Sequence, residues 1–108
     1  MTTLKPAVSG DINDTRVFTL NGPQSNLDDV TAIEAHVWLL GGTPETLAAS
    51  VTDSATKQVT VELGDGTGWL KTAAAGSYLF EIQATFGSTV LTWPQGSPSV
   101  LKVRTEGD

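Results

Sequence analysis

His36 is the only histidine in the chain, so any Ser-His-Asp catalytic set would have to include it. The sequence contains no Gly-x-Ser-x-Gly segment, the pattern that presents the nucleophile in many hydrolases. His36 also falls in the middle of a predicted strand, on the face opposite the apolar residues. We therefore expect a surface or interface histidine, and we predict that the protein is not an enzyme.

Two other groups of residues have types that can bind ions. Residues 64–68 read Gly-Asp-Gly-Thr-Gly, but neither Lys-Ser nor Lys-Thr follows and no helix of useful length begins there, so a turn is expected, not a phosphate loop. Asp11, Asp14, Asp28 and Asp29 could gather around calcium at one end of the domain, although their spacing matches no calcium-binding loop. We expect solvated loop acids, with Asp29 as a cap or turn residue, and predict no metal and no cofactor.

Composition excludes several functional classes. The absence of cysteine rules out disulfides, thiolate catalysis and cysteine-ligated metals. The chain has 12 acidic and 6 basic residues, and the basic residues are scattered, so we expect no binding to nucleic acid. No apolar run approaches the roughly 20 residues of a membrane helix, so we expect no membrane contact. The first residues lack the apolar segment of a signal peptide, and we do not expect secretion by that route.

The elements that would position these residues are strands. From Tyr78 to Phe86 every second residue is apolar, which is typical of a strand with one buried face, and Gly87-Ser88 suits a tight hairpin turn. The same pattern predicts seven strands, over residues 15–21, 31–40, 47–53, 58–63, 78–86, 89–93 and 99–104. Residues 69–75 are predicted to form a single helical turn.

Short strands at regular intervals favour a single all-β domain over residues 1–108. We predict an immunoglobulin-like antiparallel β-sandwich of about seven strands, with a small closed barrel as the alternative. Residues 1–10 are a candidate extended N-terminal arm. The residues expected between the two sheets are Phe18, Leu20, Val37, Val59, Val61, Tyr78, Phe80, Ile82 and Val103.

Three tryptophans are more than one narrow core easily buries. Trp38 falls on the polar face of its strand and is our first candidate for an anchor in a protein–protein contact. A carbohydrate-binding module is the rival interpretation. It would need several exposed aromatic residues with polar partners, and the sequence does not place them together.

Residues 46–52 contain no charge, although edge strands of free domains are normally protected by charge, proline or a bulge. Lys5-Pro6 suits an extended arm, over residues 2–8, that becomes ordered on docking. We therefore predict a protein interface made of the arm, the Trp38 face and this uncharged edge. The candidate residues are Lys5, Pro6, Val8, Trp38, Thr46, Ala48, Ser50 and Thr52.

Four segments, residues 10–20, 27–37, 75–86 and 91–94, resemble in order a family of small tailed-phage proteins similar to the N-terminal domain of the siphophage upper baseplate protein. Matching features are the Gly10-Asp11 lead, Gly76-Ser-Tyr-Leu-Phe-Glu81 and Thr92-Trp-Pro94. The chain departs from the family at residues 29–32, where it has Asp-Val-Thr-Ala instead of a segment containing Thr-Gly-Ala, and at Trp93, where the family has Phe.

This resemblance implies a virion structural protein with an immunoglobulin-like sandwich and no enzymatic activity. A tail or baseplate module that binds other virion proteins in multiple copies is the leading expectation. A capsid decoration or head-to-tail accessory protein is the alternative. Because this sequence stops at Asp108, without the family's downstream domains, we do not expect it to bind a host receptor.

Overall fold

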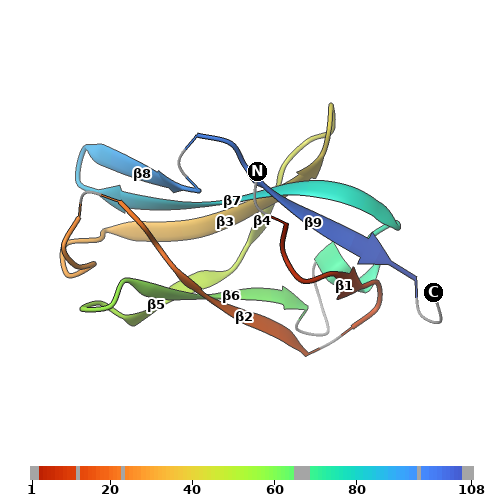
Figure 1. Cartoon of the computed structure of the whole chain (residues 1–108), viewed down its shortest axis with the longest axis horizontal. Coiled ribbons are helices and arrows are strands. Elements are labelled where there is room, and N and C mark those ends of the chain that lie inside the picture. The colour runs from red at the N-terminus through yellow and green to blue at the C-terminus, as the bar shows by residue number, and fades with distance from the viewer. Residues whose placement is uncertain (1–2, 12, 23, 65–68, 95, 106–108) are drawn as a thin grey trace.

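The computed structural model describes residues 3–11, 13–22, 24–64, 69–94 and 96–105 as an all-β sandwich (Figure 1). Two sheets pack face to face, and a short 3-10 helix, η1, closes one end. The strands are β1 (Ala7–Val8), β2 (Asp14–Thr19), β3 (Ala32–Leu39), β4 (Glu45–Leu47), β5 (Ala49–Asp53), β6 (Gln58–Gly64), β7 (Gly76–Phe86), β8 (Thr89–Trp93) and β9 (Ser99–Arg104), and η1 spans Trp69–Lys71. Within this part of the chain, no helix has the length and apolar character needed to span a membrane.

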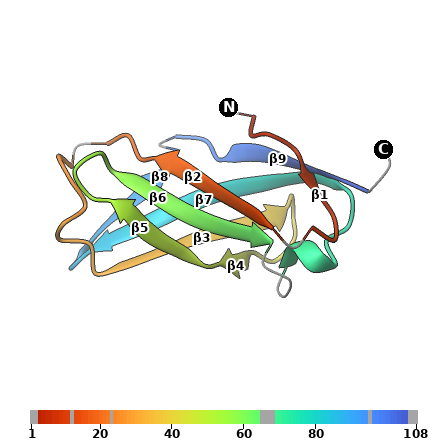
Figure 2. The same ribbon diagram turned by 90° about the horizontal axis from the view of Figure 1, so that it is seen from below.

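The larger sheet, sheet A, has the order β1-β9-β7-β3-β4. The long strand β7 pairs with β3 along one side, and with β8 and β9 end to end along the other. Sheet B has the order β2-β6-β5 (Figure 2). These orders are consistent with an immunoglobulin-like arrangement, and the separation into two sheets excludes the closed barrel.

Three details differ from the expectation. Segment 47–53 was expected to be one strand, but the chain forms β4 in sheet A and then β5 in sheet B. Residues 7–8 add a short strand, so the structure describes nine strands instead of about seven. Strand β1 also runs parallel to β9, whereas all the other described strand pairs are antiparallel.

Alternating burial places the predicted core between the sheets. In β7, Tyr78, Phe80, Ile82 and Ala84 are buried, whereas the residues between them are half-buried on the outer face. All the predicted core residues are buried except Phe18, which is half-buried and packs against the core from β2. The hairpin turn is also confirmed, because Gly87 has a positive φ of 63° at the first of the two turn positions.

Aromatic contacts join the two sheets. The Tyr78 hydroxyl donates a hydrogen bond of 2.8 Å to the Ala74 carbonyl, an arrangement resembling the tyrosine corner of immunoglobulin domains. Two residues further along β7, the ring of Phe80 lies 5.3 Å from that of Phe18 in sheet B. The Trp93 ring lies 5.4 Å from the Phe18 ring, so aromatic packing, and not a disulfide, joins the sheets here.

Gly64 is needed at the end of β6. It is buried, and a Cβ atom at this position would overlap the carbonyl oxygen of Asp11 and lie 3.0 Å from Leu70. This close approach brings the loop before β2 against the end of β6. The rest of the predicted glycine-rich turn, residues 65–68, lies outside the described residues.

Candidate functional site

His36 lies on the outer face of sheet A between two carboxylates. Its Nε2 is 3.4 Å from Glu34 Oε1, and its Nδ1 is 3.9 Å from Glu81 Oε1. The histidine side chain is only 17% exposed because Trp38, Thr46 and the strand β7 surround it on the sheet surface. The predicted position on the face opposite the core is confirmed, and the imidazole contacts acids of the kind that hold its orientation.

The four aspartates considered for calcium do not form one group. Asp14 is paired with Arg16 at the start of β2, with a distance of 2.9 Å between Arg16 Nε and Asp14 Oδ1. Asp28 accepts a hydrogen bond from Ser54. Ser54 lies in the β5–β6 turn, at the end of sheet B opposite to Asp14. Among the residues that the structure describes, no cluster of three or more histidine or acidic side chains is placed to hold a metal ion.

The predicted N-terminal arm lies along its own domain. Leu4 N donates a 2.8 Å hydrogen bond to Val100 O, and Ala7 and Val8 pair with Val103 and Arg104 of β9. Ala7 is buried and Val8 is half-buried, whereas Lys5 and Pro6 are exposed. Residues 3–8 are therefore extended, as expected, but they form an edge of sheet A; Thr2 lies outside the described residues.

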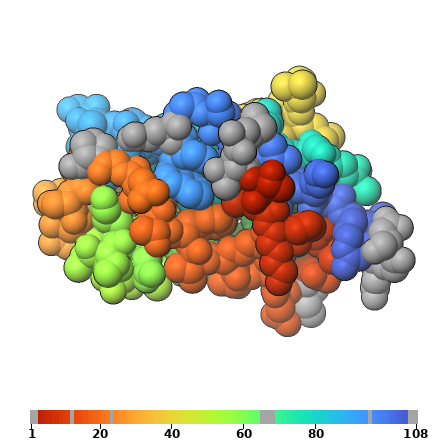
Figure 3. Space-filling view, in the orientation of Figure 1, coloured from red at the N-terminus to blue at the C-terminus, as the bar shows by residue number. Residues whose placement is uncertain are grey.

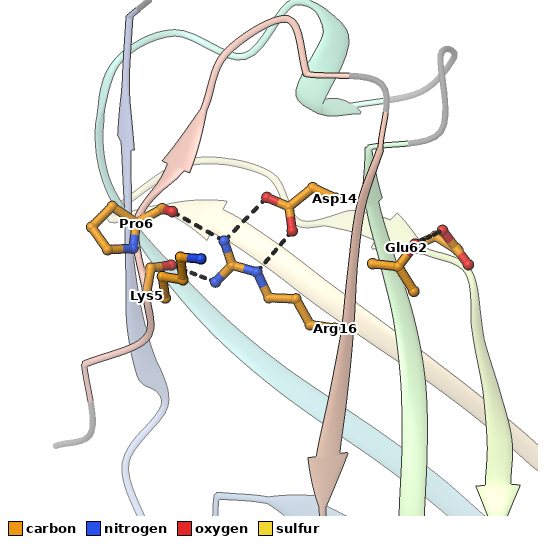
Figure 4. Close-up of polar contacts among 6 residues, drawn as sticks. Lys5, Pro6, Asp14, Arg16 and Glu62 are labelled. Atoms are coloured by element: carbon orange, nitrogen blue, oxygen red, sulfur yellow. Dashed lines mark hydrogen bonds and ion pairs between the residues drawn. The ribbon is translucent and has the colours of Figure 1, made fainter.

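Arg16 fastens this segment to sheet B (Figure 4). Its guanidinium group donates to both carboxylate oxygens of Asp14, and also to the carbonyl oxygens of Lys5 and Pro6. The Arg16 and Asp14 side chains are only 13% and 14% exposed. These bonds run from β2 in sheet B to the segment that lies beside β9 in sheet A. The Arg16–Asp14 pair therefore links the two sheets on this side of the molecule.

The uncharged segment 46–52 is not one continuous edge. Thr46 lies on the outer face of sheet A, where it pairs with His36 of the neighbouring strand, whereas Ser50 and Thr52 belong to sheet B. The two strands are short, and the pairing of β5 with β6 shifts near Thr52. Short strands and a bulge are devices that protect an edge, so strand addition along this segment is not favoured.

What the segment does provide is part of a flat face, which we call the threonine face. It is the outer surface of sheet B, the sheet turned toward the viewer in Figure 2. Its side chains are mostly small and uncharged. Val17 pairs with Thr60, which pairs in turn with Ser50, and the hydroxyl groups of Thr52 and Thr60 contact each other. The face comprises Thr15, Val17, Thr19, Ala48, Ser50, Thr52, Gln58, Thr60 and Glu62. Residues from β2 and β6 were missed in the sequence, and the available signal was threonine at their outward positions.

Trp38 is on the other face of the sandwich. It is half-buried on the outer surface of sheet A, where it pairs with Leu79, which pairs in turn with Val100. Thr46 lies on the same surface, one strand away. The structure thus divides the predicted interface residues among the outer face of sheet A, the threonine face and the N-terminal segment.

An aromatic pocket of about 210 Å³ lies between the β3–β4 turn and η1. The rings of Trp69 and Tyr78 meet edge to face there, with their centroids 5.1 Å apart. The lining residues are Val37, Trp38, Leu39, Gly42, Thr43, Glu45, Trp69 and Tyr78. The sequence did not show that two tryptophans and the tyrosine would meet beside polar groups.

A scan of protein-family models finds no match to this chain, and no curated protein or solved structure is significantly similar to it.

Proposed function

We propose that this chain is a non-enzymatic structural module of a bacteriophage particle and that it binds other virion proteins. The observation that supports this most is the threonine face. It is an exposed sheet surface with one carboxylate, Glu62, in a chain with a net charge of -6.

The cost of desolvation favours this face as a docking surface. Burying a charged side chain without a partner is expensive, whereas threonine, serine and alanine lose little side-chain entropy on being covered, and the hydroxyl groups can hydrogen-bond to a partner. Even Glu62 is partly satisfied within the face, because the Thr15 hydroxyl donates it a 2.7 Å hydrogen bond. A flat face of this kind suits packing against a protein surface, and it offers nothing that would attract nucleic acid or a membrane.

The phage role rests on the resemblance of the sequence to baseplate-type domains. A tail or baseplate position is the first choice within it, and a capsid decoration or head-to-tail accessory role is the alternative. Copy number separates the two: a decoration protein is present in far more copies per particle than a baseplate component. Quantitative mass spectrometry of purified particles measures it directly, and absence of the protein from the particles would contradict the virion role.

Surface variants test the docking face. We expect Thr60→Arg, at the centre of the threonine face, to reduce incorporation into particles while leaving the melting temperature nearly unchanged. Thr72→Arg is the matched control, because Thr72 is exposed outside this face and its replacement should incorporate normally. Normal incorporation of a folded Thr60→Arg protein would show that another surface makes the contact.

A carbohydrate-binding module is the second candidate, and the aromatic pocket favours it. Aromatic rings beside hydrogen-bonding groups such as Glu45 and Thr43 suit a sugar ring, which has apolar and polar surfaces. A glycan array, followed by calorimetry on any positive sugar, tests this function. Binding that is lost in Trp69→Ala but retained in Val17→Ala, at an exposed position of sheet B, would support it, and no binding to any sugar would leave protein docking as the function.

A further inference from the structure

Leu40 forms an exposed apolar knob at one end of sheet A. It is 88% exposed and is the first residue of the β3–β4 connection, which rises above the sheet in Figures 1 and 3. The turn is rigidly defined: Gly42 N donates a 2.7 Å hydrogen bond to Leu39 O, and Gly41 has a φ of 82°, as a type II turn requires. The backbone at Leu40 is therefore fixed by a hydrogen-bonded turn.

A groove lies toward the other end of the same sheet. Its volume is about 350 Å³, and Val90, which is 56% exposed, forms part of its wall. We call it the Val90 groove. Its lining residues are Glu81, Val90, Leu91, Thr92, Pro94, Gly96 and Pro98.

The knob and the groove face the same way. In β3 the outward positions are Glu34, His36 and Trp38, and the alternation continues to Leu40. Val90 pairs with Thr85 on that same outer side of the sheet. Because Leu39 pairs with Tyr78 at one end of β7, whereas β8 pairs with residues 82–86 at the other, Leu40 cannot reach its own groove.

We infer that the outer face of sheet A is a symmetric contact between two copies of this chain, with Leu40 of each copy seated in the Val90 groove of the other. A two-fold axis lying between the facing sheets and crossing the long axis of the molecule reverses its ends. When this axis is perpendicular to the line that joins Leu40 to the groove, it exchanges the two positions and brings each knob to the partner's groove. The stripe of Trp38, Leu79 and Val100 lies between the two contacts and is covered as well.

The charges and dimensions agree with this partner. Residues 39–44 and 89–101, which form the knob and most of the groove, contain no charged residue, which limits repulsion between two acidic copies. The molecule measures 42 × 26 × 20 Å, and a face of this size can supply the roughly 800 Å² per partner of a standard interface.

Cysteine cross-linking tests the geometry, because the natural chain has no cysteine. A Leu40→Cys/Val90→Cys protein treated with a short bifunctional cross-linker, which joins two thiol groups, should give a dimer that carries two links and does not grow further. A ladder of higher oligomers would instead indicate head-to-tail chains and overturn the symmetric dimer. Absence of cross-linked species would also overturn it, as would cross-linking of the control Leu40→Cys/Val17→Cys, whose second cysteine lies on sheet B.

Point variants test the energetics by light scattering and sedimentation. Leu40→Asp and Val90→Asp should each raise the dimer dissociation constant by about tenfold or more, whereas Val17→Asp should not change it. A wild-type protein that stays monomeric at all concentrations, or a dimer that neither variant weakens, would overturn the inference. The result is independent of the virion role: a dimer absent from particles refutes only that role, and an incorporated monomer refutes only the dimer.

Discussion

Ser99 has a buried hydroxyl group without a hydrogen-bond partner in the described structure. It begins β9 opposite Phe80, so the hydroxyl points into an apolar core. We expect Ser99→Ala to raise the free energy of unfolding by about 1 kcal/mol, because it removes an unsatisfied polar group at little cost in volume. Urea unfolding measures the change, and Ser77→Ala, at an exposed position of β7, should have almost no effect. A loss of stability in Ser99→Ala would mean that the hydroxyl has a partner.

Phe80 sits at the meeting point of the two sheets. It is fully buried in β7 and contacts Phe18 of β2. We expect Phe80→Ala to lower the free energy of unfolding by about 3–5 kcal/mol, since the cavity left between the sheets cannot collapse fully. Leu79→Ala, one residue away on the outer face, should cost much less. Equal losses in thermal or denaturant unfolding would contradict the assigned core.

At the level of elements, the hydrogen bonds of Arg16 to Asp14, Lys5 and Pro6 control how firmly β1 is held. Arg16→Ala removes the donors to Lys5 and Pro6, and it leaves the nearly buried Asp14 carboxylate without its partner. We expect amide hydrogen exchange of Leu4 and Ser9 to accelerate on the order of tenfold or more, because their bonds to β9 then open locally.

Two comparisons control this measurement. The amide of Ile82, in the central strand β7, should exchange at its wild-type rate, and Lys102→Ala should leave the whole pattern unchanged. Uniform acceleration across the protein would indicate global destabilisation. Protection of Leu4 and Ser9 equal to that of the wild type would show that the Arg16 hydrogen bonds are not needed to hold this segment.

At the level of the whole molecule, net charge opposes any association between copies. The chain carries a formal charge of -6, and raising the ionic strength from about 10 mM to about 150 mM shortens the screening length from about 30 Å to about 8 Å. We therefore expect the dimer to tighten with salt, as measured by sedimentation equilibrium. Weakening with salt would instead show that ion pairs across the interface outweigh the repulsion between the two copies.

The overall architecture was largely predictable because burial alternates along most of β3, β6 and β7. The passage from β4 to β5 was not, because Leu47, Ala49 and Val51 keep the same inward alternation while the chain changes sheets. Strand β1 is too short to show a period. The threonine face was hidden for another reason: its residues come from three strands that are separated in the sequence, and only pairing brings them together.

The aromatic tie between the sheets has a consequence for the conditions in which the domain can fold. Phe18, Phe80 and Trp93 join the layers by contact alone, so no oxidant is needed to close the sandwich and no reductant can open it. These apolar contacts are instead sensitive to temperature. Apolar contacts weaken on cooling, whereas a covalent cross-link does not, so the junction between the two layers weakens in the cold, where a disulfide would hold.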